Sequence, residues 1–258
     1  DLCKNIKREV REHLQDVRDD NATPEVAILR LRQISCEPNF AVQASAVPND
    51  TYMPQLWGLH QSNDIDMDAP EAWNRSTGSM RVVIAVIDTG VLATHPDLKD
   101  NMWVNPREVA GDGIDNDGNG IVDDINGYNA INESGNPTDD HGHGTHVSGT
   151  IAGRGNNGLG VVGVAHRAKI MALKFLSSTG SGGIYDAIQA TDYITAMKQR
   201  GVNVVASNNS WGGGGYSTAM YNAIERAKNA GVLFIAAAGN SATNNDSSPH
   251  YPSSYNND

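Results

Sequence analysis

Cysteine, an apolar leader and long apolar runs are all scarce or missing in this sequence. The only two cysteines, Cys3 and Cys36, stand near the start of the 258 residues. A disulfide framework or a cysteine nucleophile is therefore excluded for everything that follows them. No run of eighteen apolar residues occurs, which argues against a membrane span. The chain opens at Asp1 without Met or an apolar leader, so we expect an internal piece whose targeting signal, if any, lay upstream.

Basic residues are also few, and the acidic excess is local. The formal net charge is −11. Between Asp97 and Asp140 there are eleven acidic and two basic residues, a net of −9, which leaves −2 for the rest of the chain. Such a concentration predicts cation binding in this region and argues against a nucleic-acid partner.

Alternating apolar and amphipathic segments after Met80 predict a soluble α/β domain. Strands are expected at about 82–88, 169–175, 202–208 and 232–238, because these runs are apolar almost throughout. Helices are expected at 145–153, 184–200 and 217–230. The pattern predicts a parallel sheet flanked by helices, with its ligand site at the carboxyl ends of the strands. With 39% hydrophobic residues, the chain can bury one domain plus an appendage.

Three polar residues at the ends of apolar runs or at a helix start have the chemistry of acyl transfer. Asp88 ends the first strand, His143 stands at a helix start and Asn240 follows the last strand. A carboxylate can orient an imidazole base, and an amide can donate a hydrogen bond to an oxyanion. Each has a plainer interpretation alone, such as a turn residue for Asn240. Together they favour a hydrolase.

The motifs around these residues resemble those of the subtilisin-like serine proteases. They read Val-Ile-Asp-Thr-Gly, His-Gly-Thr-His-Val-Ser-Gly-Thr, Asn-Asn-Ser-Trp-Gly-Gly and Ala-Ala-Ala-Gly-Asn, and the similarity runs from about Glu37 to the last residue. The resemblance implies an Asp-His-Ser triad in which Asp88 orients the imidazole of His143 and His143 is the general base. Outside the triad, Asn240 would donate a hydrogen bond to the oxyanion. His146 is then a structural, packed neighbour.

The family's nucleophile is missing from these residues. It is expected in a Gly-Thr-Ser-Met-Ala segment that opens a helix, and no such segment occurs. Ser253 and Ser254 follow Pro252 in a predicted loop and are not candidates. We therefore expect the serine beyond Asp258 and no peptide hydrolysis by these residues alone.

Two other functions remain open at this point. One is a non-catalytic, calcium-binding pseudo-protease that acts as a binding or inhibitory module. The other is a zinc hydrolase built on His141, His143 and His146, whose spacing is short enough for metal ligands.

The resemblance also implies a polypeptide substrate. Ser210, Trp211 and Gly212 match the edge on which an extended peptide pairs by strand addition. His250 aligns near the floor of the first specificity pocket, and an exposed loop histidine is the alternative.

Calcium is predicted at two places. In the acidic loop, oxygen-bearing residues alternate as in an EF-hand, although the usual closing Glu is replaced by Asn126. The ligands expected there are Asp115, Asp117, Asn119, Ile121 and Asp123. A solvated acidic loop without an ion is the alternative. The second site follows from the resemblance only, and its ligands are Asp50, Asp97 and Asn157.

The first part of the chain resembles the end of a propeptide. Residues 4–18 have helical spacing and 26–34 alternate like a strand, while 37–44 resemble the last strand of the propeptide that acts as a folding aid and intramolecular inhibitor. We expect a boundary between Val42 and Asn49, with a propeptide-like segment at 1–45 and the catalytic region at 46–258. Secretion is implied by the resemblance alone.

Overall fold

The computed structural model describes residue 8 and residues 47–257. The chain divides into two units, residues 1–44 and 45–258. The described strands and helices named below belong to the second unit. The predicted helix at 4–18, except Arg8, the strand at 26–34, both cysteines and the propeptide-like residues 37–44 lie outside the described residues. The propeptide interpretation stays a prediction.

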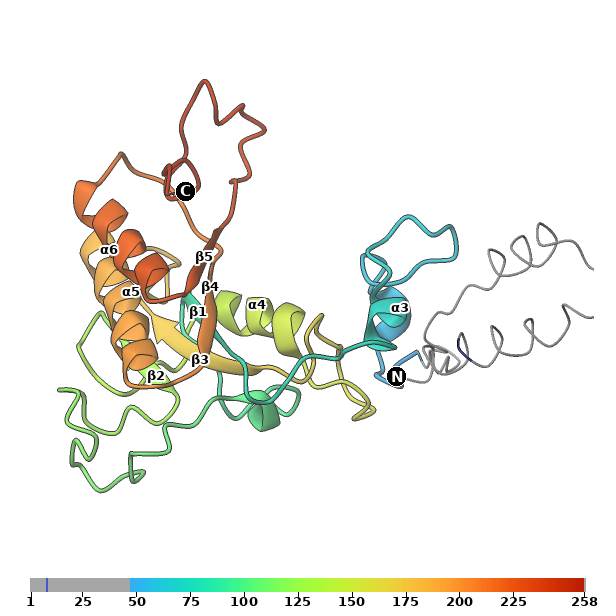
Figure 1. The fold of residues 1–258 in the computed structure, drawn as a ribbon, viewed down its shortest axis with the longest axis horizontal. Coiled ribbons are helices and arrows are strands. Elements are labelled where there is room, and N and C mark those ends of the chain that lie inside the picture. Colours follow the sequence, from blue (N-terminus) through green and yellow to red (C-terminus); the bar gives the residue numbers. More distant parts are fainter. Residues whose placement is uncertain (1–7, 9–46, 258) are drawn as a thin grey trace, which may run out of the picture. The chain divides into compact units, whose positions relative to one another are not determined.

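A five-stranded parallel sheet forms the centre of the fold (Figure 1). Its strands, in the order β2-β3-β1-β4-β5, are β2 (Gly127–Asn129), β3 (Lys169–Lys174), β1 (Val83–Asp88), β4 (Val204–Asn209) and β5 (Leu233–Ala236). Four of them lie where the apolar runs predict them. The sequence did not predict β2, which is too short for an apolar pattern.

Both faces of the central strand β1 are buried, which explains its uniformly apolar sequence. Ala85 and Ile87 belong to one core cluster together with residues of α5 (Ile184–Gln199) and α6 (Thr218–Asn229). Val86 belongs to a second cluster that includes Ala152 of α4 (His143–Ala152). Helices α5 and α6 lie on one side of the sheet and α4 on the other (Figure 1). The predicted parallel α/β sheet flanked by helices is confirmed.

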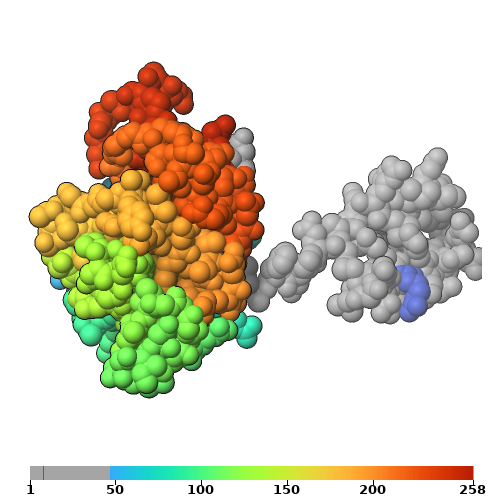
Figure 2. Space-filling view, turned by 90° about the vertical axis from the view of Figure 1, so that its left-hand side faces the viewer, coloured from blue at the N-terminus to red at the C-terminus, as the bar shows by residue number. Residues whose placement is uncertain are grey.

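Three shorter helical segments complete the described part of the chain. They are η2 (Met53–Gln55), α3 (Ala69–Trp73) and η3 (Lys99–Asn101). Figure 2 shows the outer surface of α5 and α6, in yellow to orange-red, with the green acidic loop beside them. Among the described residues, no helix is long and apolar enough to cross a bilayer.

The edge strand β5 carries unusually exposed apolar side chains. Leu233 is 67% exposed and Ile235 is 53% exposed. Within the described residues β5 pairs only with β4, so its other edge is free. Exposed Leu and Ile side chains on an edge strand are typical of a surface that another segment or another protein covers.

Candidate active site

The carboxyl end of β1 places an acid against the first residue of α4. Asp88 is fully buried, and its Oδ1 lies 2.7 Å from Nδ1 of His143. The same oxygen accepts a hydrogen bond from the backbone N–H of Thr89 at 2.7 Å. The two residues are 55 positions apart in sequence. The structure therefore brings together the acid and the base that the sequence predicts.

This contact fixes which nitrogen of His143 is available for chemistry. A carboxylate can only accept hydrogen bonds, so the ring nitrogen that faces Asp88 carries the proton. In the neutral ring, Nε2 is then left as a proton acceptor. The side chain of His143 is 43% exposed and lines an open cleft. The arrangement can take a proton from a group in the cleft, and the buried carboxylate stabilises the imidazolium that forms.

The absence of a side chain at Gly144 allows the start of α4 to lie directly against the end of β1. A Cβ atom at Gly144 would overlap the carbonyl oxygen of Gly90 and would lie 3.1 Å from Cβ of Asp88. The helix therefore starts directly above the strand end, and its first residue, His143, reaches the carboxylate. This start lies two residues before the predicted one at 145, which makes the base itself the first helical residue.

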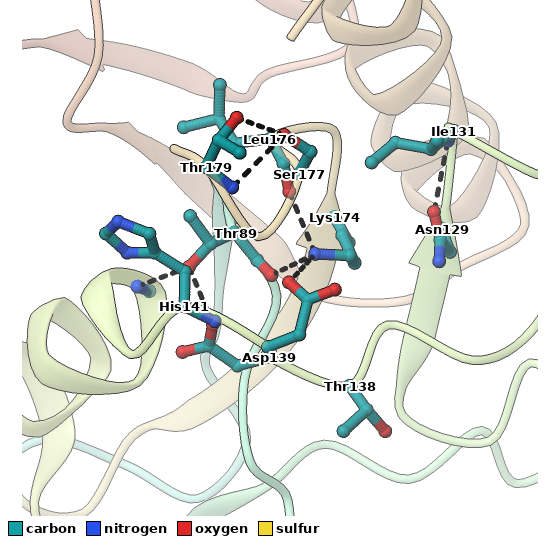
Figure 3. A network of polar contacts seen from close by, with 12 residues as sticks. Thr89, Asn129, Ile131, Thr138, Asp139, His141, Lys174, Leu176, Ser177 and Thr179 are labelled. Carbon is teal, nitrogen blue, oxygen red and sulfur yellow. Dashed lines mark hydrogen bonds and ion pairs between the residues drawn. The ribbon is translucent and has the colours of Figure 1, made fainter. Parts of the chain in front are cut away.

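A second carboxylate, that of Asp139, joins the two segments that carry the acid and the base. Its Oδ1 accepts from Thr89 Oγ1 at 2.8 Å and from the N–H of Gly142 at 2.8 Å. Its Oδ2 accepts from both the N–H and the hydroxyl of Thr145 in α4. Figure 3 shows Asp139 between Thr89 and His141, whose N–H also donates to it. The sequence analysis missed this role, because nothing local links position 139 to position 89.

The hydrogen-bond donors around Asp139 outweigh the effect of its burial on the pKa. Burial raises the pKa of this carboxyl. The backbone N–H of Gly142, the Thr145 side chain and two further N–H groups lower it more, and the result is a pKa of about 2. Asp139 is therefore ionised at every pH at which a His base can work.

A buried lysine closes the same network from the neighbouring strand. Lys174 ends β3 beside Asp88, and its Nζ donates to the carbonyl oxygens of Thr89 and Leu176 at 2.8 and 2.9 Å. It also forms an ion pair with Asp140 at 2.6 Å. The ends of β1 and β3 and the loop before α4 are thus held together at one point.

The predicted substrate-binding residues border the cleft that His143 lines. The cleft has a volume of about 630 Å³, and Ser210, Trp211 and Gly212 line it together with Gly182 and Gly183 among others. The Trp211 ring packs edge-on against Phe175 with ring centroids 4.8 Å apart. The edge that follows β4 is therefore anchored by an aromatic side chain, and its glycines leave room for an extended chain.

His250 and Asn240 lie at the ends of neighbouring loops. His250 is half-buried against Gly212 and Gly239, so it is not the exposed loop histidine of the alternative interpretation. Asn240 is exposed just beyond β5 and directly follows Gly239. Its role as an oxyanion donor stays a prediction.

In the described part of the chain the three predicted histidines are not gathered as ligands of one metal ion. His141 and His143 line the cleft, and their ring centroids are 6.4 Å apart. His146 lines a different cavity, together with Leu56 and Leu59 among others. Within the described residues, the acidic group below is the one set of three or more His, Cys, Asp or Glu side chains placed to share an ion. His146 is exposed in the described part of the chain, and its role as a packed neighbour stays a prediction.

The acidic loop brings together part of the predicted calcium ligand set. One carboxylate oxygen each from Glu108, Asp115 and Asp117 lie within 4.8 Å of one another. Oδ1 of Asp117 is buried and accepts no hydrogen bond, and Arg200 lies 3.5 Å from it. A buried carboxylate oxygen without a hydrogen bond fits a cation ligand, and in the described residues the Arg200 guanidinium is the positive group that faces it. The alternating pattern did not reveal Glu108, which precedes the loop.

The other predicted ligands of this loop form hydrogen bonds with neighbouring groups of the same loop. The carboxylate of Asp123 accepts from the N–H groups of Gly111 and Gly113. The amide of Asn119 donates to Asp124, while its oxygen accepts from the N–H of Ile121. These contacts hold the loop in shape, and the full ligand set stays a prediction.

The second predicted calcium set is gathered in one place. Asp50 and Asp97 are both buried. Asn157 Nδ2 donates to Asp97 Oδ1 at 2.7 Å, and the Asn157 N–H lies 3.4 Å from Asp50 Oδ1. Among the described residues no lysine or arginine pairs with either carboxylate, and two buried carboxylates beside an asparagine fit the oxygen-donor chemistry of a calcium site.

Comparisons with known proteins show the family of the chain. The model of the subtilase family matches residues 79–258. Subtilisin-like protease 1 of Plasmodium falciparum is 39% identical over 202 residues, which cover 78% of this chain and 28% of that protein. An extracellular protease of Xanthomonas campestris is 34% identical over 235 residues, which cover 83% of this chain and 40% of that protein.

A solved structure supports the fold as well. A structure of proteases from Pseudoalteromonas arctica matches with a TM-score of 0.64 and 27% identity, over 82% of this chain and 64% of that one. The chain spans well under half the length of the Plasmodium and Xanthomonas relatives.

Proposed function

Because the chain belongs to the subtilase family, we propose that it is the part of a serine-type endopeptidase that carries the acid and the base of an Asp-His-Ser triad. The observation that supports this proposal most is the 2.7 Å contact between buried Asp88 and His143 at the rim of a cleft. A binding module has no need to hold an imidazole by one nitrogen and leave the other open to a cleft.

In this proposal a polypeptide substrate lies in the cleft as an added strand along Ser210–Gly212. His143 takes the proton of the serine hydroxyl through Nε2 as the oxygen attacks the carbonyl carbon. Asp88 stabilises the imidazolium without itself taking the proton, and Asn240 donates a hydrogen bond to the oxyanion. His143 then passes the proton to the leaving amine, and water hydrolyses the acyl-enzyme in the same way.

The nucleophile is proposed to lie in a continuation of the chain beyond residue 258. Exposed Leu233 and Ile235 on β5 offer an apolar surface for such a segment. A cavity of about 790 Å³ beside α4, lined by Leu56, Leu59 and Val162 among others, offers another. Burial of these surfaces would place the continuation over the same side of the sheet as His143.

Calcium is proposed as a structural ion at both carboxylate clusters. Asp50, Asp97 and Asn157 would hold one ion, and Asp115, Asp117 and Glu108 would contribute to the other. When bound, the ion neutralises carboxylates that otherwise repel one another. The remaining predicted ligands, Asn119, Ile121 and Asp123, belong to this proposal only if the loop rearranges around the ion.

Regulation and location are proposed from the family. Residues 1–45 would be the end of a propeptide that acts as an intramolecular inhibitor. Secretion agrees with the name of the Xanthomonas relative, an extracellular protease.

Hydrolysis of a denatured protein such as casein by the full-length polypeptide tests the function. We expect activity that falls by roughly 10⁴-fold in Asp88→Asn, which keeps the shape of the side chain but removes the charge that selects the tautomer. Asp192→Asn, at an exposed ion pair with Arg226, is the matched control and should keep full activity. An inactive wild-type protein that binds polypeptides would favour the pseudo-protease instead.

A further inference from the structure

A separate cavity lies at the amino ends of β1, β3 and β4. Its volume is about 500 Å³, and its lining includes Val83 and Lys169, the first residues of β1 and β3, and Asn203, which precedes β4. Asp88 stands at the other end of the six-residue strand β1, roughly 16 Å away along the strand. The cavity shares no lining residue with the cleft that His143 lines.

The charged side chains that line this cavity are mostly positive, although the whole chain has a net charge of −11. The lining contains four cations, Arg81, Arg107, Lys169 and Arg200, and one carboxylate, that of Asp117. The four cations come from segments that are far apart in the sequence. The fold therefore gathers positive charge at a place where the local sequence does not concentrate it.

One of these cations is already engaged by the acidic loop. Nη1 of Arg200 donates to the carbonyl oxygen of Asp117 at 2.9 Å and lies 3.5 Å from Oδ1 of the same residue. Nη2 of Arg200 donates to the carbonyl oxygen of Gly118 at 3.0 Å. The charge of Arg200 is thus balanced by Asp117, and three cations remain.

The remaining three cations have only neutral partners. In the described part of the chain, no carboxylate forms an ion pair with Arg81, Arg107 or Lys169. Nη2 of Arg107 donates to the carbonyl oxygen of Arg200 at 3.1 Å. Nζ of Lys169 donates to two backbone carbonyl oxygens, both at 3.0 Å. The guanidinium of Arg81 forms no hydrogen bond with the described residues. All three side chains therefore keep N–H groups free for a ligand.

Buried apolar side chains form another part of the lining. Val83, Trp103 and Met197 are 5%, 6% and 2% exposed. Burial also lowers the pKa of Lys169, while the charge of Asp100 acts in the opposite direction. An ammonium group that has lost part of its water is stabilised by an anion close to it.

We propose that this cavity binds the phosphate or sulfate group of a small ligand, with Arg81, Arg107 and Lys169 as the binding residues. A carboxylate has two oxygens and is satisfied by a single guanidinium fork. A phosphate group has three strong acceptor oxygens, which can accept hydrogen bonds from three cations at once. The two arginines can each bind such oxygens through two N–H groups.

Calorimetric titration of the full-length protein with three probes tests the site. The probes are inorganic phosphate, phenyl phosphate, and benzyl alcohol, which has an aromatic ring but no charge. We expect one molecule of phenyl phosphate to bind per chain and benzyl alcohol not to bind. Phenyl phosphate binding tighter than inorganic phosphate would identify an ester whose body lies on the apolar lining, and equal binding would identify the free ion.

Three variants assign the binding residues. Arg81→Gln and Arg107→Gln should each weaken phosphate binding at least about tenfold, because each removes charge-assisted hydrogen bonds. Arg75→Gln is the matched control, since it removes the same charge at an exposed position that does not line the cavity. At 0.15 M salt it should change the affinity by less than about twofold, because exposed charges at a distance are screened. Urea unfolding without ligand checks that the variants are folded.

Two results would overturn the inference. One is that neither phosphate compound binds, or that benzyl alcohol binds as tightly as phenyl phosphate. The other is that folded Arg81→Gln and Arg107→Gln bind phosphate as tightly as the wild type. The binding measurement does not depend on peptide hydrolysis, so failure of this inference and failure of the proposed function are distinguishable.

Discussion

Asp139 offers a quantitative test of how the active site is held together. We expect Asp139→Asn to destabilise the fold at neutral pH, because the amide cannot supply the negative charge that Thr89, Gly142 and Thr145 surround. The carboxyl has a pKa of about 2 in the folded chain against an ordinary value of 3.8. This difference corresponds to at most about 2.4 kcal/mol. Since Asp139 is only half-buried, solvent screening reduces the expected loss to about 1–2 kcal/mol.

The pH dependence gives the prediction its sign. A carboxyl whose pKa is lower in the folded state stabilises the fold above its unfolded pKa and loses that contribution as the pH falls through the folded pKa. For Asp139 the contribution is complete above about pH 5, about half remains at pH 3, and about a sixth remains at pH 2. The difference in stability between wild type and Asp139→Asn should therefore shrink as the solution is acidified.

Urea unfolding followed by circular dichroism at pH 7, 5 and 3 measures this difference. Asp246→Asn is the matched control, because that exposed carboxylate accepts no hydrogen bond from the described residues, and it should change stability by less than about 0.5 kcal/mol. An Asp139→Asn variant as stable as the wild type at pH 7, or equally destabilised at all three pH values, would refute the reasoning.

Three further outcomes are expected. Gly144→Ala should lower the stability measured by thermal unfolding by about 2 kcal/mol or more, because the added methyl group would overlap the Gly90 carbonyl oxygen. Gly149→Ala in the same helix should stabilise by up to about 1 kcal/mol, because its methyl group would lie 3.8 Å from the nearest side-chain atom, which is ordinary contact. Equal effects of the two variants would contradict the close approach of α4 to β1. Tyr193→Phe should cost about 1.5–3 kcal/mol in the same assay, because buried Asp124, whose pKa burial raises, loses the phenol hydrogen bond; an unchanged midpoint would count against it. A calcium chelator should lower the melting temperature, because an ion that binds only the folded state stabilises it, and an unaltered melting curve would remove both proposed calcium sites.

The sheet could be predicted from the sequence because its central strands are buried on both faces. The runs that became β1 and β3 are apolar almost throughout, as strands of a sheet covered on both sides are. The strand β2 and helix α3, with three and five residues, are too short for a hydrophobic pattern to repeat clearly. Their positions depend on contacts with distant parts of the chain.

The acid and the base could be predicted because each stands in a motif of several consecutive residues. The supporting groups could not. Asp139 reaches Thr89 across 50 positions, and Lys174 reaches it across 85. No local pattern encodes such a contact.

The most direct test of the central claim is to treat the full-length protein with a fluorophosphonate and map the modified residue by mass spectrometry. The reagent labels only a serine that a neighbouring base activates. We predict a single adduct on a serine that follows residue 258, and its loss in His143→Ala. An adduct on Ser253 or Ser254, or labelling that persists in His143→Ala, would contradict the assignment of Asp88 and His143 as the acid and base of a serine protease.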